Sequence, residues 1–284
     1  MTDVVGYVDA VSPMVVVRTK SGDVVDIAPQ AVISVRELSH TPVRNSEIRD
    51  LEHAAALAWP GVEQHWLNGW FLRAGLGVTS RANSAVPLDF SAQISDLPAV
   101  IDWYRARGLE PWLALPERLL PIRDPGIKPT RVMVRDIADA DAYAPEVPAD
   151  PTVTLLPRPD PAWLAGYQRD VPVEVLTAVV DGAVTFAGIT EAAVGRGAVT
   201  TAPDGTRWLG ISAVRVADHH RRHGHGRRVC SALLGWGTSL GAQRVYVEVL
   251  EDNSAAIALY ASMGFRLHHS HRYVNADAVI APTI

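Results

Sequence analysis

A basic, glycine-containing segment near residue 220 carries the clearest chemical signal in the sequence. The segment RRHGHGR, residues 221–227, lies between a predicted strand and a predicted helix. Glycine lets the backbone come close to a ligand, and the first amides of a helix have no partner within it. Together with the positive end of the helix dipole and the arginines, these amides are suited to bind a pyrophosphate. The glycine spacing matches neither a Walker loop nor a GxGxxG fingerprint.

Two further elements stand downstream of this segment in a fixed order. Asn253 opens a predicted helix, and Tyr260 begins a Tyr-x-x-x-Gly-Phe motif. With Arg221-x-x-Gly224-x-Gly226 ahead of them, they resemble the GNAT superfamily of acetyl-CoA-dependent N-acetyltransferases, closely over residues 208–273 and more loosely from residue 132. The resemblance implies a GNAT fold and direct transfer of an acetyl group to a primary amine in a ternary complex. Acetyl-CoA would be the co-substrate, and the acceptor a small molecule, a protein lysine or an N-terminus.

The resemblance also implies a role for each matching residue. The amides of residues 221–227 would hold the CoA pyrophosphate, and the backbone of Val214 and Val216 would bond the pantetheine arm. The Val216 N–H is a candidate donor to the oxyanion, and the Tyr260 hydroxyl would protonate the departing thiolate. The residues implied in cofactor binding are Val214, Val216, Arg221, Arg222, His223, Gly224, His225, Gly226, Arg227, Asn253 and Tyr260.

The general base is the least defined part of the predicted site. A lysine-like amine has a pKa of about 10.4 and must lose a proton before it attacks. Glu248 lies inside an otherwise apolar strand, where a carboxylate costs free energy unless it is partnered or used. Glu191, at the end of the preceding hairpin, is the alternative. A relay through water would need neither glutamate, so the identity of the base stays open.

The elements around these residues predict a mixed α+β domain over residues 130–284. Antiparallel strands, with a hairpin turn expected at Asp181-Gly182, precede a strand–loop–helix–strand–helix–strand order. This order predicts a central mixed sheet flanked by helices, the GNAT fold that the resemblance implies. A proline-rich stretch within residues 115–161 is expected to link this catalytic domain to the chain before it.

Several short strands predict a separate unit at the N-terminus. Their spacing, with a hairpin turn at Ser21-Gly22, indicates a small SH3-like β-barrel over residues 1–40. A barrel of this size could pack, oligomerise or bind a partner. We expect it to be separable from cofactor binding.

Residues 45–124 are predicted to form a degenerate GNAT-like half-repeat. Tyr104 and Gly108 stand 156 residues before Tyr260 and Gly264 respectively. Alternatively, both segments are simply ends of amphipathic helices capped by glycine. The same region carries aromatic and polar residues that could line an acceptor groove or cap the core: Trp66, Asn68, Trp70, Arg73, Arg81 and Asn83.

Composition narrows the remaining functions. The net charge of -5 argues against a dedicated nucleic-acid binder. A single cysteine, Cys230, excludes an intramolecular disulfide and fits a small core residue. Four histidines between residues 219 and 225 could form a metal tract, but the glycines and the following helix favour the pyrophosphate loop, so no metal is expected. Without a signal peptide or a membrane-length apolar run, we expect a cytoplasmic protein. A catalytically silent CoA-binding module remains the alternative function.

Overall fold

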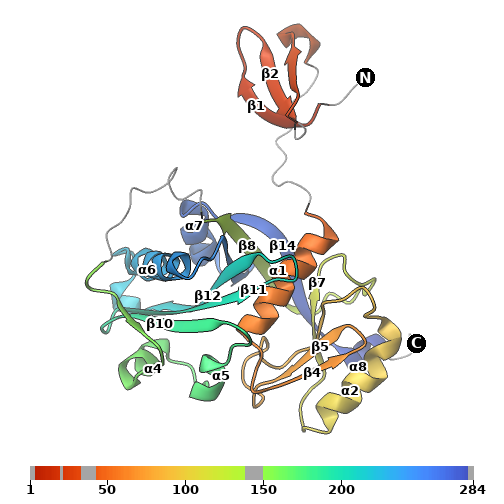
Figure 1. The fold of residues 1–284 in the computed structure, drawn as a ribbon, viewed down its shortest axis with the longest axis vertical. Helices are drawn as coiled ribbons and strands as arrows, with labels where there is room; N and C mark the ends of the chain where they lie inside the picture. Colours follow the sequence, from red (N-terminus) through yellow and green to blue (C-terminus); the bar gives the residue numbers. More distant parts are fainter. Residues whose placement is uncertain (1–3, 20–21, 33–42, 138–149, 281–284) are drawn as a thin grey trace. The chain divides into compact units, whose positions relative to one another are not determined.

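The computed structural model describes residues 4–19, 22–32, 43–137 and 150–280. The chain forms two compact units, Met1–Thr41 and Pro42–Ile284 (Figure 1). The predicted division between residues 124 and 130 is therefore not a boundary between compact units. Whether residues 45–124 descend from a half-repeat stays a prediction. Among the helices of the described ranges, none is long and apolar enough to span a membrane.

The N-terminal unit contains a three-stranded antiparallel sheet in the order β1-β2-β3. The strands are β1 (Gly6–Ala10), β2 (Val15–Thr19) and β3 (Val24–Ile27). Gly22, with φ of +90°, occupies the predicted turn between β2 and β3, where a side chain would be strained. The sequence also predicts a fourth strand over residues 31–38, and most of it lies outside the described residues. A small β-unit is thus confirmed at the N-terminus.

An eight-stranded mixed sheet organises the larger unit (Figure 1). In spatial order its strands are β7 (Trp112–Pro116), β14 (Arg266–Asn275), β8 (Ile127–Asp136), β13 (Arg244–Leu250), β12 (Arg207–Val216), β11 (Ala193–Thr201), β10 (Ala183–Ile189) and β9 (Thr154–Leu156). The strands β12 and β13 pair in parallel, which requires a crossover, and the helix α6 (His225–Ser239) lies in that connection. This confirms the predicted mixed sheet flanked by helices.

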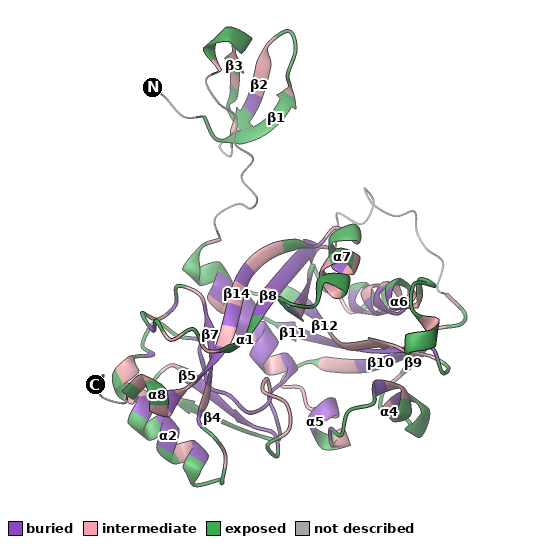
Figure 2. Cartoon of the chain, turned by 180° about the vertical axis from the view of Figure 1, so that it is seen from behind, coloured by how far each residue is buried: buried purple, intermediate pink, exposed green. Residues whose placement is uncertain are grey.

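Alternating side chains along β13 divide the core into two faces. Val245, Val247 and Val249 pack against α6 and the end of α7 (Ser254–Ser262). Tyr246 faces the opposite way and packs with Leu51 and neighbouring alanines of α1 (Asn45–Ala58). This is the period of two expected of a strand covered on both sides. Figure 2 shows the sheet strands largely buried beneath these helices.

The chain before β8 adds a second, smaller sheet and one strand of the large one. Strands β4 (Glu63–Leu67), β5 (Trp70–Ala74) and β6 (Val86–Pro87) form the small sheet, whereas β7 pairs with β14. A short 3-10 turn, η2 (Ile94–Asp96), leads into helix α2 (Leu97–Arg105), which has Pro98 in its first turn.

The ends of α2 and α7 are closed in the same way. The amide of Leu109 donates to the Tyr104 carbonyl at 3.0 Å, and that of Phe265 to the Tyr260 carbonyl at 3.0 Å. Gly108 and Gly264 both have positive φ, 64° and 84°. Both readings of the repeated motif predict this glycine cap, so it does not choose between them.

The structure corrects one predicted turn. Asp181-Gly182 lies before β10, and the hairpin between β10 and β11 turns at residues 190–192. The segment before Asp181, residues 173–180, is predicted as the first strand of this hairpin. It instead begins with the short helix α5 (Val173–Thr177), which follows Pro172 and is preceded by α4 (Pro161–Tyr167). Gly182 is needed for a different reason, because a Cβ there would lie 2.3 Å from the Val199 carbonyl oxygen. A close backbone approach therefore explains this glycine.

Candidate active site

The parallel pairing of β12 and β13 stops halfway along both strands. It runs from Trp208–Arg244 to Ile211–Val247, although β12 continues to Val216 and β13 to Leu250. Beyond this point β12 stays paired with β11, and β13 with β8. The two strands therefore part, and an edge of each is left without a strand partner.

The edge of β12 presents backbone donors to this gap. The amide of Ala217 donates to the Ala192 carbonyl at 2.9 Å on the β11 side. Because successive amides of a strand point to opposite edges, those of Val216 and Val214 point toward β13. A bulge in the pairing with β11, where Ala213 has a φ of +53°, precedes them. The roles implied for both valines in cofactor binding stay a prediction.

The loop after β12 forms a row of free amides. Residues 222–227 donate no backbone hydrogen bond within the described structure, and the first helical bond of α6 is Arg228 N to Gly224 O at 3.1 Å. Gly224, the N-cap, has a φ of +80°, and Arg222 a φ of +64°. A left-handed turn running into a helix N-terminus collects donors that can surround an anion.

Not all arginines of this loop and the start of α6 have a guanidinium group free to meet a ligand. Arg222 is exposed, and Arg221 is held by Asp218 at 2.8 Å on the surface. Arg227 donates to Ser262 Oγ at 2.7 Å, and Arg228 to Asp150 at 2.5 Å. The guanidinium groups of Arg227 and Arg228 therefore tie α6 to its surroundings, and the Arg227 amide is the part left for a ligand.

The two glycines of the loop are required for different reasons. A Cβ at Gly224 would meet nothing within 4 Å, so its positive φ is the constraint. Gly226 is buried, and a Cβ there would lie 3.3 Å from Leu259 and 3.4 Å from Val216. Gly226 does not have a positive φ, so the tight packing of α6 on β12 and α7 is its constraint.

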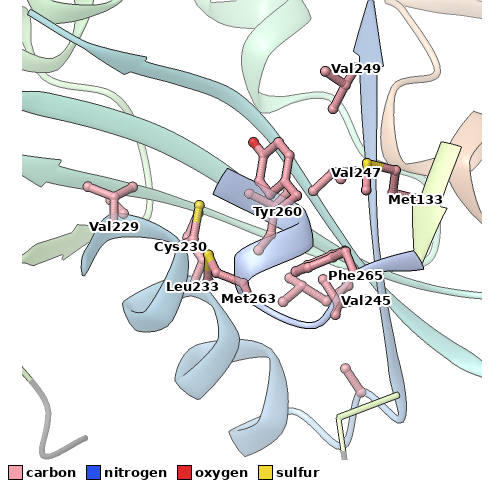
Figure 3. Close-up of a cluster of buried hydrophobic side chains, with 14 of the residues drawn as sticks. Met133, Val229, Cys230, Leu233, Val245, Val247, Val249, Tyr260, Met263 and Phe265 are labelled. Atoms are coloured by element: carbon pink, nitrogen blue, oxygen red, sulfur yellow. The ribbon is translucent and has the colours of Figure 1, made fainter. Parts of the chain in front are cut away.

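Tyr260 points from α7 into the core beside the gap. Figure 3 shows its ring between Cys230 on α6 and Val247 on β13. The side chain is 6% exposed, and no hydrogen bond to its hydroxyl is found among the described residues. Burial raises the pKa of Tyr260 well above its ordinary value, so the hydroxyl keeps its proton at neutral pH.

Asn253 caps the helix that carries Tyr260. Its side-chain oxygen accepts from the Ala256 amide at 3.1 Å, and residue 253 is exposed. This is the ordinary role of asparagine at an N-cap. Its side-chain amide group is left for the contact with the cofactor arm that the sequence predicted.

Glu248 lies on the other face of the sheet, where β12 and β13 part. Its side chain is 6% exposed, and Arg81 Nε donates to its Oε2 at 2.7 Å. Both border a small pocket of about 10 Å³, room for about one water molecule. The pocket is lined by Trp59, Arg81, Gly210, Ile211, Ser212, Tyr246 and Glu248.

Trp59, which the sequence analysis did not select, is fixed at this pocket by two contacts. Its Nε1 donates to Ser212 Oγ at 3.1 Å, and the Arg196 guanidinium lies 4.4 Å from its ring centre. Arg196 is fully buried and donates to the carbonyl of Ala58 at 2.8 Å, at the end of α1. An arginine inside a strand of small and apolar residues was the available signal.

Glu191 occupies a different place. It is exposed in the β10–β11 turn with a φ of +58°. Its neighbour Ala192 is bonded to Ala217, at the far end of β12. Ser212, level with Glu248, lies five residues back along β12 from Ala217, roughly 16 Å at the strand rise. The structure therefore does not bring Glu191 and Glu248 together.

The aromatic and polar residues of the first half divide between core and site. Arg73 donates to Ser84, and Asn83 bonds to the loop around Gly75, so both brace the chain. Trp70 is fully buried, whereas Trp66 is 48% exposed. Arg81 alone of the six lines the pocket with Glu248.

The histidines near residue 220 lie beside one another on the loop. His219 and His220 have ring centres 4.4 Å apart, and His220 and His225 5.5 Å. In the part of the chain that the structure describes, no three His, Cys, Asp or Glu side chains are grouped to hold a metal ion. Cys230 is fully buried, which raises the pKa of its thiol to about 12, as suits a core residue.

Comparisons with known proteins match both units. Residues 45–274 match the family "Probable histone acetyltransferase Rv0428c C-terminal", and residues 1–36 match "Rv0428c N-terminal Sm-like domain". The N-terminal β-unit is therefore Sm-like rather than SH3-like. "Probable histone acetyltransferase Rv0428c" of Mycobacterium tuberculosis is 48% identical over 98% of this chain and 90% of its own length.

More distant proteins agree with this assignment. "Uncharacterized N-acetyltransferase YobR" of Bacillus subtilis is 25% identical over 80% of this chain and 98% of its own. A solved structure, a GCN5-related N-acetyltransferase from Kribbella flavida, has the same fold, with a TM-score of 0.56 over 81% of this chain and 94% of that one, at 16% identity. The chain belongs to the Rv0428c family, acetyltransferases of GNAT fold with an N-terminal Sm-like domain.

Proposed function

We propose that this protein transfers the acetyl group of acetyl-CoA to a primary amine by direct attack in a ternary complex. The observation that carries the proposal is the point where β12 and β13 part. Free amides and the Tyr260 hydroxyl border it on the side of α6 and α7, and the Glu248 carboxylate borders it on the side of α1. An acyl donor and an acceptor could therefore meet there from opposite faces.

The residues on the α6 side fit the cofactor. The amides of residues 222–227 would hold the pyrophosphate, and those of Val214 and Val216 would bond the amide-containing arm. Exposed Arg222 and Arg221 add positive charge, and Asn253 has an amide group available. When bound, acetyl-CoA supplies the acetyl group as a thioester.

Three groups of the chain then serve the transfer. Glu248 accepts the proton that the amine must lose. The Val216 amide donates to the oxygen that gains charge during attack. Tyr260 gives its proton to the departing sulfur, since burial keeps the hydroxyl protonated. Glu191 is a weaker choice of base because it lies on the surface at the far end of β12.

The pocket favours a slender acceptor. Its lining includes Trp59 and Tyr246, and it has room for about one water molecule, so it would take only a small terminal group such as the ammonium of an unbranched aminoalkyl chain and not a bulky amine. Aromatic faces also attract an ammonium group. The histone named in the description of the Mycobacterium tuberculosis relative presents such chains as lysines. We therefore propose a lysine side chain as the acceptor.

Release of free thiol from acetyl-CoA tests the proposal. The panel contains lysine peptides from histone tails, the same peptides with acetylated lysines, and small amines. We expect thiol release with unblocked lysines and its loss in Glu248→Gln, while calorimetry shows unchanged CoA affinity. A protein that binds CoA but releases no thiol with any amine would instead be the silent CoA-binding module.

A further inference from the structure

A chain of buried titratable groups runs from Glu248 away from the pocket. His271 Nε2 lies 3.9 Å from Glu248 Oε2, and His271 Nδ1 lies 3.4 Å from Glu52 Oε1 on α1. The same Glu52 oxygen lies 2.8 Å from His269 Nε2. The side chains of these four residues are at most 7% exposed. Burying this many ionisable groups costs free energy, so a use or a full set of partners is expected.

Strand register places these groups on one face. Glu248 pairs with Val132 of β8, and Val132 pairs with His269 of β14 on its other side. His271 follows two residues later and so points the same way as His269. Glu52, on the buried side of α1, comes down onto this row. The arrangement thus follows from three strands and a helix that the chain brings together from distant positions.

Within this row of buried groups, one nitrogen of His271 lacks a hydrogen-bond partner among the described residues. His271 Nε2 is buried and makes no hydrogen bond within the described structure. An unpaired buried polar atom typically costs about 1–3 kcal/mol. The Glu52 carboxylate, which only accepts, is within hydrogen-bond distance of Nδ1, whereas Glu248 is not within that distance of Nε2. We therefore assign the proton of neutral His271 to Nδ1, with the Nε2 lone pair toward Glu248. A carboxylate that fixes the tautomer of a histidine base is a known catalytic arrangement.

The charges around His271 allow it to gain a proton near neutral pH. Burial lowers its pKa, but the hydrogen bond and charge of Glu52 and the charge of Glu248 outweigh burial and raise the pKa above 6.5. Arg81 acts in the opposite direction. The titratable groups that face this part of the core are Glu52 from α1, Glu248 and Tyr246 from β13, Arg81 from the loop before β6, and His269 and Tyr273 from β14 itself.

We propose that His271 is the proton acceptor behind Glu248, and that Glu52 is the positioning residue that orients it. The inference rests on the proposed function, in which Glu248 takes the proton of the amine. Because Glu248 Oε2 and His271 Nε2 lie 3.9 Å apart, the two side chains must first approach to hydrogen-bond distance. The O–H bond formed on Glu248 then breaks as its proton passes to His271 Nε2, and Glu248 returns to a carboxylate. His271 becomes an imidazolium that keeps its Nδ1–H on Glu52. The proton returns through Glu248 to solvent when the product leaves.

Two readouts test this on the full-length protein. Histidine NMR titration follows the imidazole of His271, identified by the signal missing in His271→Gln. The pH dependence of kcat is measured with acetyl-CoA and a saturating lysine peptide. Since neutral His271 is the acceptor, kcat of the wild type should fall as pH decreases through the pKa of His271. Glu52→Gln removes the group that raises this pKa, so both the NMR transition and the acidic limb should move to lower pH, by about one unit or more.

His271→Gln provides the second variant. Its kcat at neutral pH should fall at least about 100-fold, the low end for general acid–base catalysis, and its acidic limb should be lost. CoA affinity should stay within about twofold, and His65→Gln, at an exposed histidine, should behave as the wild type. If Glu52→Gln does not fold, the profile of His271→Gln decides.

The outcomes separate this inference from the proposed function. The inference is overturned if folded His271→Gln keeps the wild-type pH dependence of kcat. It is also overturned if the NMR transition of His271 occurs at the same pH in Glu52→Gln as in the wild type. Glu248→Gln would still be inactive in those cases, so the proposed function would stand. If Glu248→Gln keeps the wild-type kcat, the proposed base is wrong and the inference falls with it.

Discussion

Arg81 Nε donates to Glu248 Oε2 at 2.7 Å, across 167 residues of chain. Arg81 belongs to the loop between β5 and β6, and Glu248 to β13 of the large sheet. The guanidinium also lies 5.5 Å from the ring centre of Trp59 at the end of α1. The region predicted as a half-repeat therefore contributes directly to the pocket of the candidate site.

We expect Arg81→Gln to destabilise the protein and slow the transfer. Glu248 would keep a charge in a nearly buried position without its cation, which should lower the free energy of unfolding by about 1–3 kcal/mol. Denaturant titration measures this change. Arg105→Gln, which breaks an exposed pair with Asp277, is the matched control and should have almost no effect. Equal stabilities of the two variants would show that the buried pair contributes nothing.

The pH–rate profiles of Glu248→Gln and Glu191→Gln should differ. Glu248→Gln keeps the side-chain shape but cannot accept a proton, so its rate should fall about 10²–10⁴-fold at neutral pH. The rate should recover in part as pH rises, because more of the amine is then already deprotonated. Glu191→Gln, at an exposed turn, should follow the wild type. If Glu191→Gln is the variant that loses its acidic limb, the base is Glu191, and if neither changes, the proton leaves through water.

Gly226→Asp should abolish CoA binding and leave the fold intact. The Cβ of the new side chain would lie 3.3 Å from Leu259 and 3.4 Å from Val216, which is tight. The charge of its carboxylate would also repel a pyrophosphate. Gly235→Ala is the control in the same helix, since a Cβ there meets nothing within 4 Å. We expect normal CoA affinity and about 0.5–1 kcal/mol of added stability for Gly235→Ala. Calorimetry showing wild-type affinity for Gly226→Asp would refute the proposed cofactor site.

Tyr260→Phe should keep CoA affinity and reduce turnover. The ring would still pack against Cys230 and Phe265, whereas the proton donor would be gone. We expect a loss of about 10²–10⁴-fold in kcat, measured where chemistry limits the rate. The absence of a thiol burst in pre-steady-state kinetics would show that chemistry limits the rate. Unchanged turnover would exclude Tyr260 as the acid.

His268 should make the protein less stable in mild acid. Burial, with the charge of His269, lowers the pKa of His268 to about 3. Between about pH 6.5 and pH 3, His268 therefore binds a proton in the unfolded chain but not in the folded protein. Stability is then fully present above about pH 6.5 and falls as pH decreases toward 3. One pH unit below 6.5 this costs about 1.4 kcal/mol, or roughly 3–6 °C in Tm. His268→Gln should lose less Tm over that interval than the wild type, with exposed His65→Gln as the control. Parallel Tm curves for all three proteins would contradict this.

Elements whose chemistry is local could be predicted from the residue types along one segment. A strand, a loop with glycines at positions 224 and 226, and an amphipathic helix place free amides at a helix N-terminus wherever the helix packs. The cap of α7 and the position of Tyr260 on it follow from Asn253 and Gly264 in the same way. Such features depend on backbone conformation within a few residues, which residue type largely controls.

The groups that meet Glu248 could not be predicted in this way, because packing between distant segments brings them together. The sequence showed a carboxylate in an apolar strand, but its contacts with Arg81 and His271 depend on a loop far back in the chain and on the register of β8 between β13 and β14. The hairpin turn predicted at Asp181-Gly182 is wrong for the same reason. Glycine is needed at position 182 because the backbone there lies close to the carbonyl of Val199 on a neighbouring strand. Strand neighbours and side-chain partners are set by packing between distant segments, and a pattern read along one segment does not contain them.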